Sequence, residues 1–458
     1  MLWWGGISLF ALAFLVVWFK YEKILFLLLT ASLPLSFPIL IGAGLRVDAP
    51  SEIIIALLAL ATVLRYLFFE ENIVAKFLKI DLISCVISMY ILWSVVALLF
   101  SEMGMVSLKT VMVQLSYVLV FFVAFRDLLK QQNISVSHIY MYYAATLILV
   151  LVYSFWNWIP YQFVPQAAIL IAEPFFSDHT ILSTALVFVM PFLIVYGYDS
   201  KKQYKWLLLC ATIVFMIVVI MLHARAAWIS ILISICLLAM FYFGLRMKQF
   251  YLLLCLGLLS IYVFQGAIMN TIAVNQSDSS AKHANLVEET QSVININNDV
   301  SNLERINRWS CAWRMFLDRP IVGFGPGTYQ FQYIDYQRSS EMTRISVTSP
   351  YHKHRQGTGG SAHSEYFLRL SESGFPAFIL YVLLWLAALK TGLQCIDRYN
   401  NNKELFFIYA ILFALSSYFI HSFFNNFLET GKLAFLFWSS FALLSYHKHR
   451  IKGINHKV

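Results

Sequence analysis

Long, continuous apolar runs are the feature that most limits how this chain can fold. Thirteen stretches carry few or no charged residues, and roughly 20 apolar residues at a rise of about 1.5 Å each suffice to cross the ~30 Å hydrocarbon core of a bilayer. Charged residues make up 12% of the chain, whereas about a quarter is usual in soluble domains. Membrane barrels alternate in short segments, while these runs are continuous. The sequence therefore predicts an all-α polytopic membrane protein, a bundle of about 12 or 13 transmembrane helices with one large, partly helical outer loop.

The predicted spans divide the chain into four parts. Residues 1–269 hold about ten spans, 270–362 form the outer loop, 363–447 form an interfacial helix and three spans, and 448–458 form a basic tail. The first span lacks a basic n-region and a small-residue cleavage site, so we expect a retained helix rather than a signal peptide. Only His421 is an ionisable residue moderately deep in a span. The expected spans are 2–19, 24–42, 51–69, 81–99, 109–125, 138–158, 180–197, 205–222, 226–243, 249–268, 375–393, 405–422 and 430–446.

Lysine and arginine are concentrated in alternate loops, which predicts the orientation of the bundle. Short loops rich in these residues face the cytoplasm, whereas the other short loops hold little beyond Arg46, Lys109 and Arg225. The basic set would therefore be cytoplasmic, with the C-terminus inside and the long loop outside. The net charge of +9 reflects this topology, so we expect no nucleic-acid partner. The basic set lies at 20–23, 76–79, 126–130, 201–205, 246–248, 390–403 and 448–457.

The outer loop changes character along its length. Its first part, "NQSDSSAKHANLVEETQSVININNDVSN", is polar and typical of a mobile segment. The following "LERINRWSCAWRMFLDRP" has apolar residues at helical spacing and ends at Pro320, which predicts an amphipathic helix on the membrane surface or over the bundle. "GFGPGTYQF" lacks the GK[ST] ending of a phosphate loop, so its glycines are interpreted as structural.

Three arginines on the predicted outer face are candidates for binding phosphate. Arg225 lies in a tight hairpin between two spans, and Arg305 and Arg308 lie on the amphipathic helix. Guanidinium groups remain charged and donate paired hydrogen bonds that suit a phosphate. The alternatives are a snorkelling interfacial arginine for Arg225 and solvated helix charges for the other two.

His363 is the candidate for proton chemistry, because an imidazole can accept a proton from a hydroxyl near neutral pH. We expect it to open a short helix at 363–372, which ends at Gly374, with Pro376 in the first turn of the next span. The alternative is a structural histidine. Glu365 and Glu372 are placed to tune its imidazole.

Other histidines compete for this assignment. His352 and His354 lie in "YHKHR", whose basic neighbours are typical of a flexible surface. A zinc site that combines them with His363 would lack cysteine or acidic partners at ligand spacing, so we expect no metal. Asp178, His179 and His223 fall on the same predicted face as the arginines.

Several motifs together resemble the O-antigen ligase and O-unit polymerase superfamily. They are "SNLERINRW", "RPIVGFGPGTYQF" and "AHSEYFLRLSESGFPAFILYVLLW". "HARAAWISI" is similar to the family's Ser-Arg-Gly element, and "PFFSDHTILSTALVFVMP" resembles the segment entering its central span, in a Bacteroidota-like form.

The resemblance implies an inner-membrane glycosyltransferase that moves a glycan from undecaprenyl diphosphate to an acceptor hydroxyl in the periplasm, without a metal or cofactor. Its partners would be the lipid-linked donor, the acceptor and membrane lipids. The resemblance further implies that Arg225 and Arg305 hold the donor diphosphate and that His363 activates or orients the acceptor. We further expect Arg308, His223, His179, Asp178, Glu365 and Tyr366 to bind the substrates.

The acceptor separates the alternatives. An O-antigen ligase would use lipid A-core, an O-unit polymerase another lipid-linked repeat, and a protein-glycosylating member a polypeptide. A flippase or transporter of lipid-linked sugars would have a similar number of spans but should show internal repeats and midplane charges, which this sequence does not clearly show. We expect the ligase, with an inverting, metal-independent displacement.

Overall fold

The computed structural model describes residues 21–41, 45–68, 81–131, 136–163, 167–168, 171–199, 201–253, 255–256, 259, 300–338, 341, 360–399 and 401–455. Within these ranges, nine helices are long and apolar enough to cross a membrane. The protein is thus an all-α, multi-pass membrane protein, as its apolar runs predict. The predicted span 2–19 and much of 249–268 lie outside the described residues.

The helices follow the apolar runs closely, and most predicted boundaries hold to within a few residues. A π-helical segment η1 joins α5 to α6, so that the three form one continuous span. The elements are α2 (Ser51–Phe68), α4 (Leu82–Leu99), α5 (Gly104–Tyr117), η1 (Val118–Ala124), α6 (Phe125–Lys130), α7 (Val136–Trp158), η2 (Ile159–Tyr161), α8 (His179–Asp199), α9 (Lys202–Met221), α10 (Arg225–Tyr242), α13 (Val300–Asp318), α14 (Tyr329–Gln332), η4 (Tyr333–Tyr336), α16 (Glu365–Ile396), α17 (Asn402–His421) and α18 (Gly431–Asn455).

The predicted span 24–42 is wrong in its second half. A helix covers 21–35, and the chain then forms a strand, β1 (Phe37–Ile41), which pairs antiparallel with β2 (Leu45–Ala49). Pro38 explains the change, because proline has no backbone N–H to continue the helix and disfavours helical geometry at the residue before it.

α18 lies in the core of the bundle. Its residues from 433 to 445 are buried, with side chains in contact with several other helices. A helix that is apolar on every side is expected to be buried. The ring of Phe435 packs against Phe26, Phe121, Tyr140 and Tyr143, with centroids 5.4 to 6.4 Å apart.

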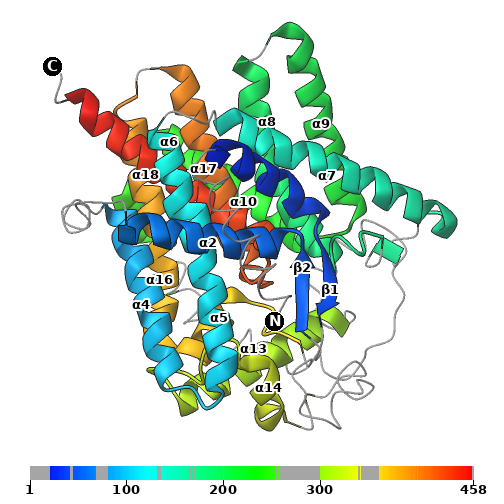
Figure 1. The fold of residues 1–458 in the computed structure, drawn as a ribbon, viewed down its shortest axis with the longest axis vertical. Coiled ribbons are helices and arrows are strands. Elements are labelled where there is room, and N and C mark those ends of the chain that lie inside the picture. The colour runs from blue at the N-terminus through cyan, green and yellow to red at the C-terminus, as the bar shows by residue number, and fades with distance from the viewer. Residues whose placement is uncertain are drawn as a thin grey trace.

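The amphipathic helix expected in the outer loop is present as α13, and it packs over the bundle against the first part of α16. A second apolar cluster forms beneath it, centred on Cys311, Met315, Tyr329 and Leu368. In Figure 1, α13 and α14 lie at the same end of the molecule as the turn between α4 and α5.

The loop after α13 is docked onto a break in α16. Gly374 has φ 73° and ψ −175°, which interrupts the helix as the sequence predicts. The amide of Phe324 donates to the carbonyl of Ser371 at 3.1 Å, and that of Gly325 donates to the carbonyl of Glu372 at 2.8 Å. The glycines of this loop are structural, because a Cβ at Gly323 would lie 2.4 Å from the backbone of Glu372.

Several connections meet at this end of the bundle, which we call the loop end. The turn at 100–103 touches the loop after α13 through Ser101 Oγ, 3.3 Å from the carbonyl oxygen of Phe324. The amide of Glu365 donates to the carbonyl of Ser422 at 2.9 Å, and the ammonium of Lys432 donates to the carbonyl of Phe175. Segments 100–103, 171–178, 360–364 and 422–430 are therefore gathered in one region.

Candidate functional site

Trp309 joins α13 to the start of α16 and so fixes the position of His363. Its ring stacks on Phe367 at 5.5 Å and meets Phe423 edge-on at 5.1 Å. Its Nε1–H donates to the carbonyl oxygen of His363 at 3.3 Å. One side chain thus holds the amphipathic helix, the residue before α16 and the segment after α17 in contact.

His363 precedes the helix that it was expected to open. α16 begins at Glu365, with Ser364 as its N-cap, and His363 has a left-handed φ of 50°. Such a φ is uncommon for a residue with a Cβ and clusters at functional sites. The helix starts later than predicted because the Ser364 side chain accepts from the amide of Phe367, which satisfies an N-terminal donor.

The electrostatic environment keeps the imidazole of His363 neutral. Burial lowers its pKa most, and the charges of Arg305 and Arg308 lower it further, whereas Glu304 and Asp178 act in the opposite sense. The net effect is a pKa of about 4. At neutral pH, His363 therefore offers a lone pair that can accept a hydrogen bond or a proton from a hydroxyl.

Arg308 already has protein partners on several sides. Its Nε donates to Glu304 Oε1 at 2.9 Å, and its guanidinium lies 4.1 Å from the centroid of the Tyr333 ring. The hydroxyl of Tyr329 donates to the backbone carbonyl of Arg308 at 2.9 Å. These contacts anchor α13 to the loop that follows it, so the effect of Arg308 on His363 is mainly electrostatic.

Arg305 is the cation shared by two histidines. Its charge acts on His363 and also on His421, at the C-terminal end of α17. The spacing of three residues places Arg305 and Arg308 on neighbouring positions of one helix face. Arg305 thus contributes positive charge that acts on two imidazoles at the loop end.

Asp178 and His179 lie at the start of α8, as predicted. The carboxylate of Asp178 accepts from the amide of Thr180 at 2.8 Å and lies 2.9 Å from His179 Nδ1. Burial alone would raise the pKa of Asp178, but the interaction with His179 and the hydrogen bond from the amide of Thr180 lower it to about 2. Its ionised carboxylate acts on both His363 and His421.

His421 is a site residue that the sequence analysis did not select. It is buried, and its Nε2 lies 3.2 Å from Thr184 Oγ1 and 3.0 Å from Asn425 Nδ2. These contacts connect α8, α17 and the segment after α17. The available signal was its position as the one ionisable residue moderately deep in a predicted span, where such residues are commonly functional.

Arg225 and His223 form the turn between α9 and α10. His223 has a φ of 50°, and its carbonyl accepts from the amide of Arg225, the first residue of α10. α10 packs along α17, and the ring of Tyr242, the last residue of α10, lies 6.4 Å from the ring of Tyr409 in the first half of α17. Arg225 therefore opens α10 at the loop end, where α17 finishes.

Glu365 and Tyr366 connect α16 to the segment after α17 and to the end of α17 itself. Glu365 is fully buried, and its Oε1 accepts from the amides of Phe427 and Leu428 at 3.0 and 2.9 Å. The hydroxyl of Tyr366 donates to the carbonyl of Phe419 at 2.9 Å. Both residues have internal partners that suit a supporting role, and the carboxylates that act on His363 are Glu304 and Asp178 instead.

The arrangement has a defined chemical capacity. A neutral imidazole lies beside guanidinium charge at the end of a membrane bundle, which suits an anionic group next to a hydroxyl that must lose a proton. In the described part of the chain, no group of three or more His, Cys, Asp or Glu side chains is placed to hold a metal ion.

Part of the chain that includes this site also matches a known protein family. Residues 208–382 match the family model described as O-antigen ligase. The matched region includes Arg225, Arg305 and His363, together with α10, α13 and the break in α16. No curated protein matches the chain. The match supports assignment of the chain to the O-antigen ligase superfamily and confirms the resemblance predicted from its motifs.

Proposed function

We propose that this member of the O-antigen ligase superfamily is a glycosyltransferase of the bacterial inner membrane, with its loop end in the periplasm. It would transfer polymerised O-polysaccharide from undecaprenyl diphosphate to a hydroxyl of lipid A-core. The observation that carries the proposal is the neutral imidazole of His363 beside the Arg305 charge, within the region that matches the family.

The orientation is supported by the distribution of charge. The basic segments at 126–130, 201–205 and 446–450 lie at the ends of helices opposite to the loop end. Such segments favour the cytoplasmic side of a membrane. The loop end, with α13 and the site, would then face the periplasm, where lipid-linked glycans of this class are used.

The chemistry proposed is a single displacement at the anomeric carbon. The acceptor oxygen forms a bond to this carbon as the bond to the diphosphate oxygen breaks, and the electron pair leaves with the diphosphate. The acceptor proton passes to His363. One displacement inverts the anomeric configuration, and no covalent intermediate with the protein is needed.

Arg305 and Arg225 would hold the departing diphosphate. A donor aimed at charge that develops in the transition state is typically worth ~3 to 4 kcal/mol, and a positioned base contributes about 10²- to 10⁴-fold in rate. Binding of the diphosphate beside Arg305 would offset the positive charge that lowers the pKa of His363. The donor would thereby make His363 a stronger base at the moment when the base is needed.

The second candidate is an O-unit polymerase, because the family match does not separate the two acceptors. Both enzymes would use the same arginines and the same imidazole. They differ in whether the accepting hydroxyl belongs to lipid A-core or to another lipid-linked repeat.

The test uses purified full-length protein in a bilayer, an undecaprenyl-diphosphate glycan and rough lipopolysaccharide. Banding of the lipopolysaccharide on a gel supports the ligase, while longer lipid-linked glycan without banding supports the polymerase. If neither banded lipopolysaccharide nor longer lipid-linked glycan forms, the proposal is contradicted. Arg305→Ala should abolish the product. Arg338 is an exposed arginine on the same loop, so Arg338→Ala is the matched control and should still form the product.

A further inference from the structure

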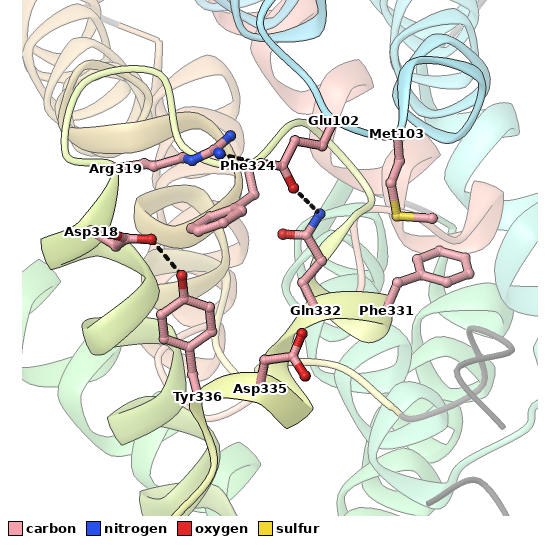
Figure 2. Close-up of a pocket in the computed structure, with 9 residues that line it drawn as sticks. All are labelled: Glu102, Met103, Asp318, Arg319, Phe324, Phe331, Gln332, Asp335 and Tyr336. Carbon is pink, nitrogen blue, oxygen red and sulfur yellow. Dashed lines mark hydrogen bonds and ion pairs between the residues drawn. The ribbon is translucent and has the colours of Figure 1, made fainter. Parts of the chain in front are cut away.

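A cavity of about 620 Å³ lies at the loop end, apart from the histidine and arginine site. Its walls come from the turn between α4 and α5, the end of α13, the loop after α13, and α14 with η4 (Figure 2). Arg305 and Asp318 are thirteen residues apart on α13, which corresponds to about 20 Å along a helix axis. The cavity therefore lies well beyond the reacting groups.

The walls of the cavity are held in place by their own contacts. Arg319 forms an ion pair with Glu102, and Gln332 Nε2 donates to the same carboxylate at 3.4 Å, so α14 and the turn after α4 are joined (Figure 2). The guanidinium of Arg319 also lies 4.6 Å from the centroid of the Phe324 ring. A cavity with fixed walls loses little conformational entropy when it binds a ligand.

The opposite wall has a phenol fixed by a carboxylate. The hydroxyl of Tyr336 donates to Asp318 Oδ2, and its ring meets Phe324 edge-on at 5.6 Å. Burial, the hydrogen bond to Asp318 and the charge of this carboxylate raise the pKa of Tyr336 to about 12. Its hydroxyl therefore stays protonated at any physiological pH.

The charges of the cavity exclude the phosphate part of a substrate. Glu102, Asp318 and Asp335 line it against the single guanidinium of Arg319. An excess of carboxylates repels a diphosphate, in contrast to the arginine-rich site around His363. The ligand must be neutral or carry an amine.

The remaining lining selects for a hydroxyl-rich ligand with apolar faces. Phe331 and Phe324 supply aromatic surface, while Gln332 and Asp335 supply amide and carboxylate groups around the same space (Figure 2). Carboxylates make strong charge-assisted hydrogen bonds with hydroxyl donors, and aromatic rings bury the C–H faces of a ligand. The volume lies in the range usual for small-molecule sites.

We propose that this cavity is a binding site for a glycan segment without negative charge, a subsite for the chain of the donor or acceptor remote from its reacting end. The inference rests on the proposed function only in naming the glycan as part of the donor or acceptor. The site itself is defined by Glu102, Phe331, Gln332 and Asp335.

Binding is tested with water-soluble polysaccharide released by mild acid from the lipopolysaccharide of the cells that make this protein. Isothermal titration calorimetry on the full chain in nanodiscs should detect binding. Phe331→Ala and Asp335→Asn should each weaken it about 5- to 10-fold, the loss expected for one ring contact or one charge-assisted hydrogen bond. Glu173→Gln, an exposed carboxylate outside the cavity, is the matched control and should bind as the wild type does.

Three outcomes would overturn the inference. The wild type shows no binding, both cavity variants bind as tightly as the wild type, or pyrophosphate displaces the polysaccharide from the wild type. Asp335 is exposed, so its conversion to Asn should leave folding intact even if Phe331→Ala does not.

Transfer assays separate this inference from the proposed function. If the polysaccharide binds and the cavity variants weaken this binding, the inferred subsite is supported even where no glycan transfer is found. If transfer occurs, Asp335→Asn should raise KM for a donor with many repeats and leave KM for a one-repeat donor unchanged. Equal effects on both donors would contradict a remote subsite.

Discussion

The indole N–H of Trp309 donates to the backbone carbonyl of His363 at 3.3 Å. This bond joins the amphipathic helix that carries Arg305 to the residue that presents the imidazole, across 54 positions of sequence. The relative position of the cation and the imidazole therefore depends on the docking of α13.

Trp309→Phe should keep most of the packing against Phe367 and remove the hydrogen bond. We expect a loss of about 1 kcal/mol in the free energy of unfolding, with a fall in kcat and little change in donor binding. Trp313→Phe is the control, because Trp313 lies on the same helix and is 47% exposed. Unfolding in detergent and single-turnover transfer measure the two effects. Equal behaviour of the two variants would show that the bond to His363 does not position the site.

The acid limb of kcat/KM should report the pKa of His363 in the free protein. Burial and the charges of Arg305 and Arg308 lower that pKa to about 4, so wild-type activity should persist well below pH 6. Arg308→Gln removes a charge that lowers the pKa, and the limb should move to higher pH. Glu304 acts in the opposite sense, so Glu304→Gln should move the limb to lower pH. Shifts of the same sign in both variants would refute this electrostatic account.

Gly374→Ala should severely destabilise the protein. Gly374 has a φ of 73°, and a Cβ there would lie 2.0 Å from the carbonyl oxygen of Ile321. The left-handed conformation alone costs about 1 to 2 kcal/mol for an L-residue, and the overlap would displace the loop after α13. Gly104→Ala is the matched control, since a Cβ at Gly104 would meet nothing within 4 Å. The yield of folded protein and its thermal midpoint measure the difference, and similar values for both variants would contradict the docking described.

Glu365→Gln should cost about 3 to 5 kcal/mol, the usual loss when one partner of a buried ion pair is removed. Glu365 is completely buried, with Arg369 Nη2 2.6 Å from its Oε2. The partly exposed pair of Glu404 and Arg450, also 2.6 Å apart, offers a comparison, because exposed pairs contribute about 0 to 1 kcal/mol. Chemical denaturation of Glu365→Gln and Glu404→Gln measures both. If Glu365→Gln loses no more free energy of unfolding than Glu404→Gln, the buried ion pair of Glu365 does not stabilise the fold.

The sequence predicted the bundle because apolar length alone decides which segments cross a bilayer. It also predicted α13 and the break at Gly374, since helical spacing and a glycine before proline are local signals. It misplaced the end of the span 24–42, because Phe37, Ile39 and Leu40 are as apolar in a strand as in a helix. Pro38 was the signal that distinguished the two.

The candidate site was less predictable than the helices. Arg225, Arg305 and His363 were selected from their residue types and predicted face. The buried contact of His421 with Thr184 joins two segments 237 residues apart in sequence. Likewise, the hydrogen bonds of Glu365 form only when the segment after α17 is folded against α16. Such contacts come from tertiary packing, which leaves no periodic pattern in the chain.

The central claim is that His363 takes the proton of the acceptor hydroxyl beside Arg305. The most direct measurement is the single-turnover rate of glycan transfer by His363→Ala in a bilayer, with binding of the lipid-linked donor measured in parallel. The account predicts a fall in rate of about 100-fold or more, with donor binding close to that of the wild type. A folded, membrane-inserted His363→Ala protein that transfers glycan at the wild-type rate would contradict it.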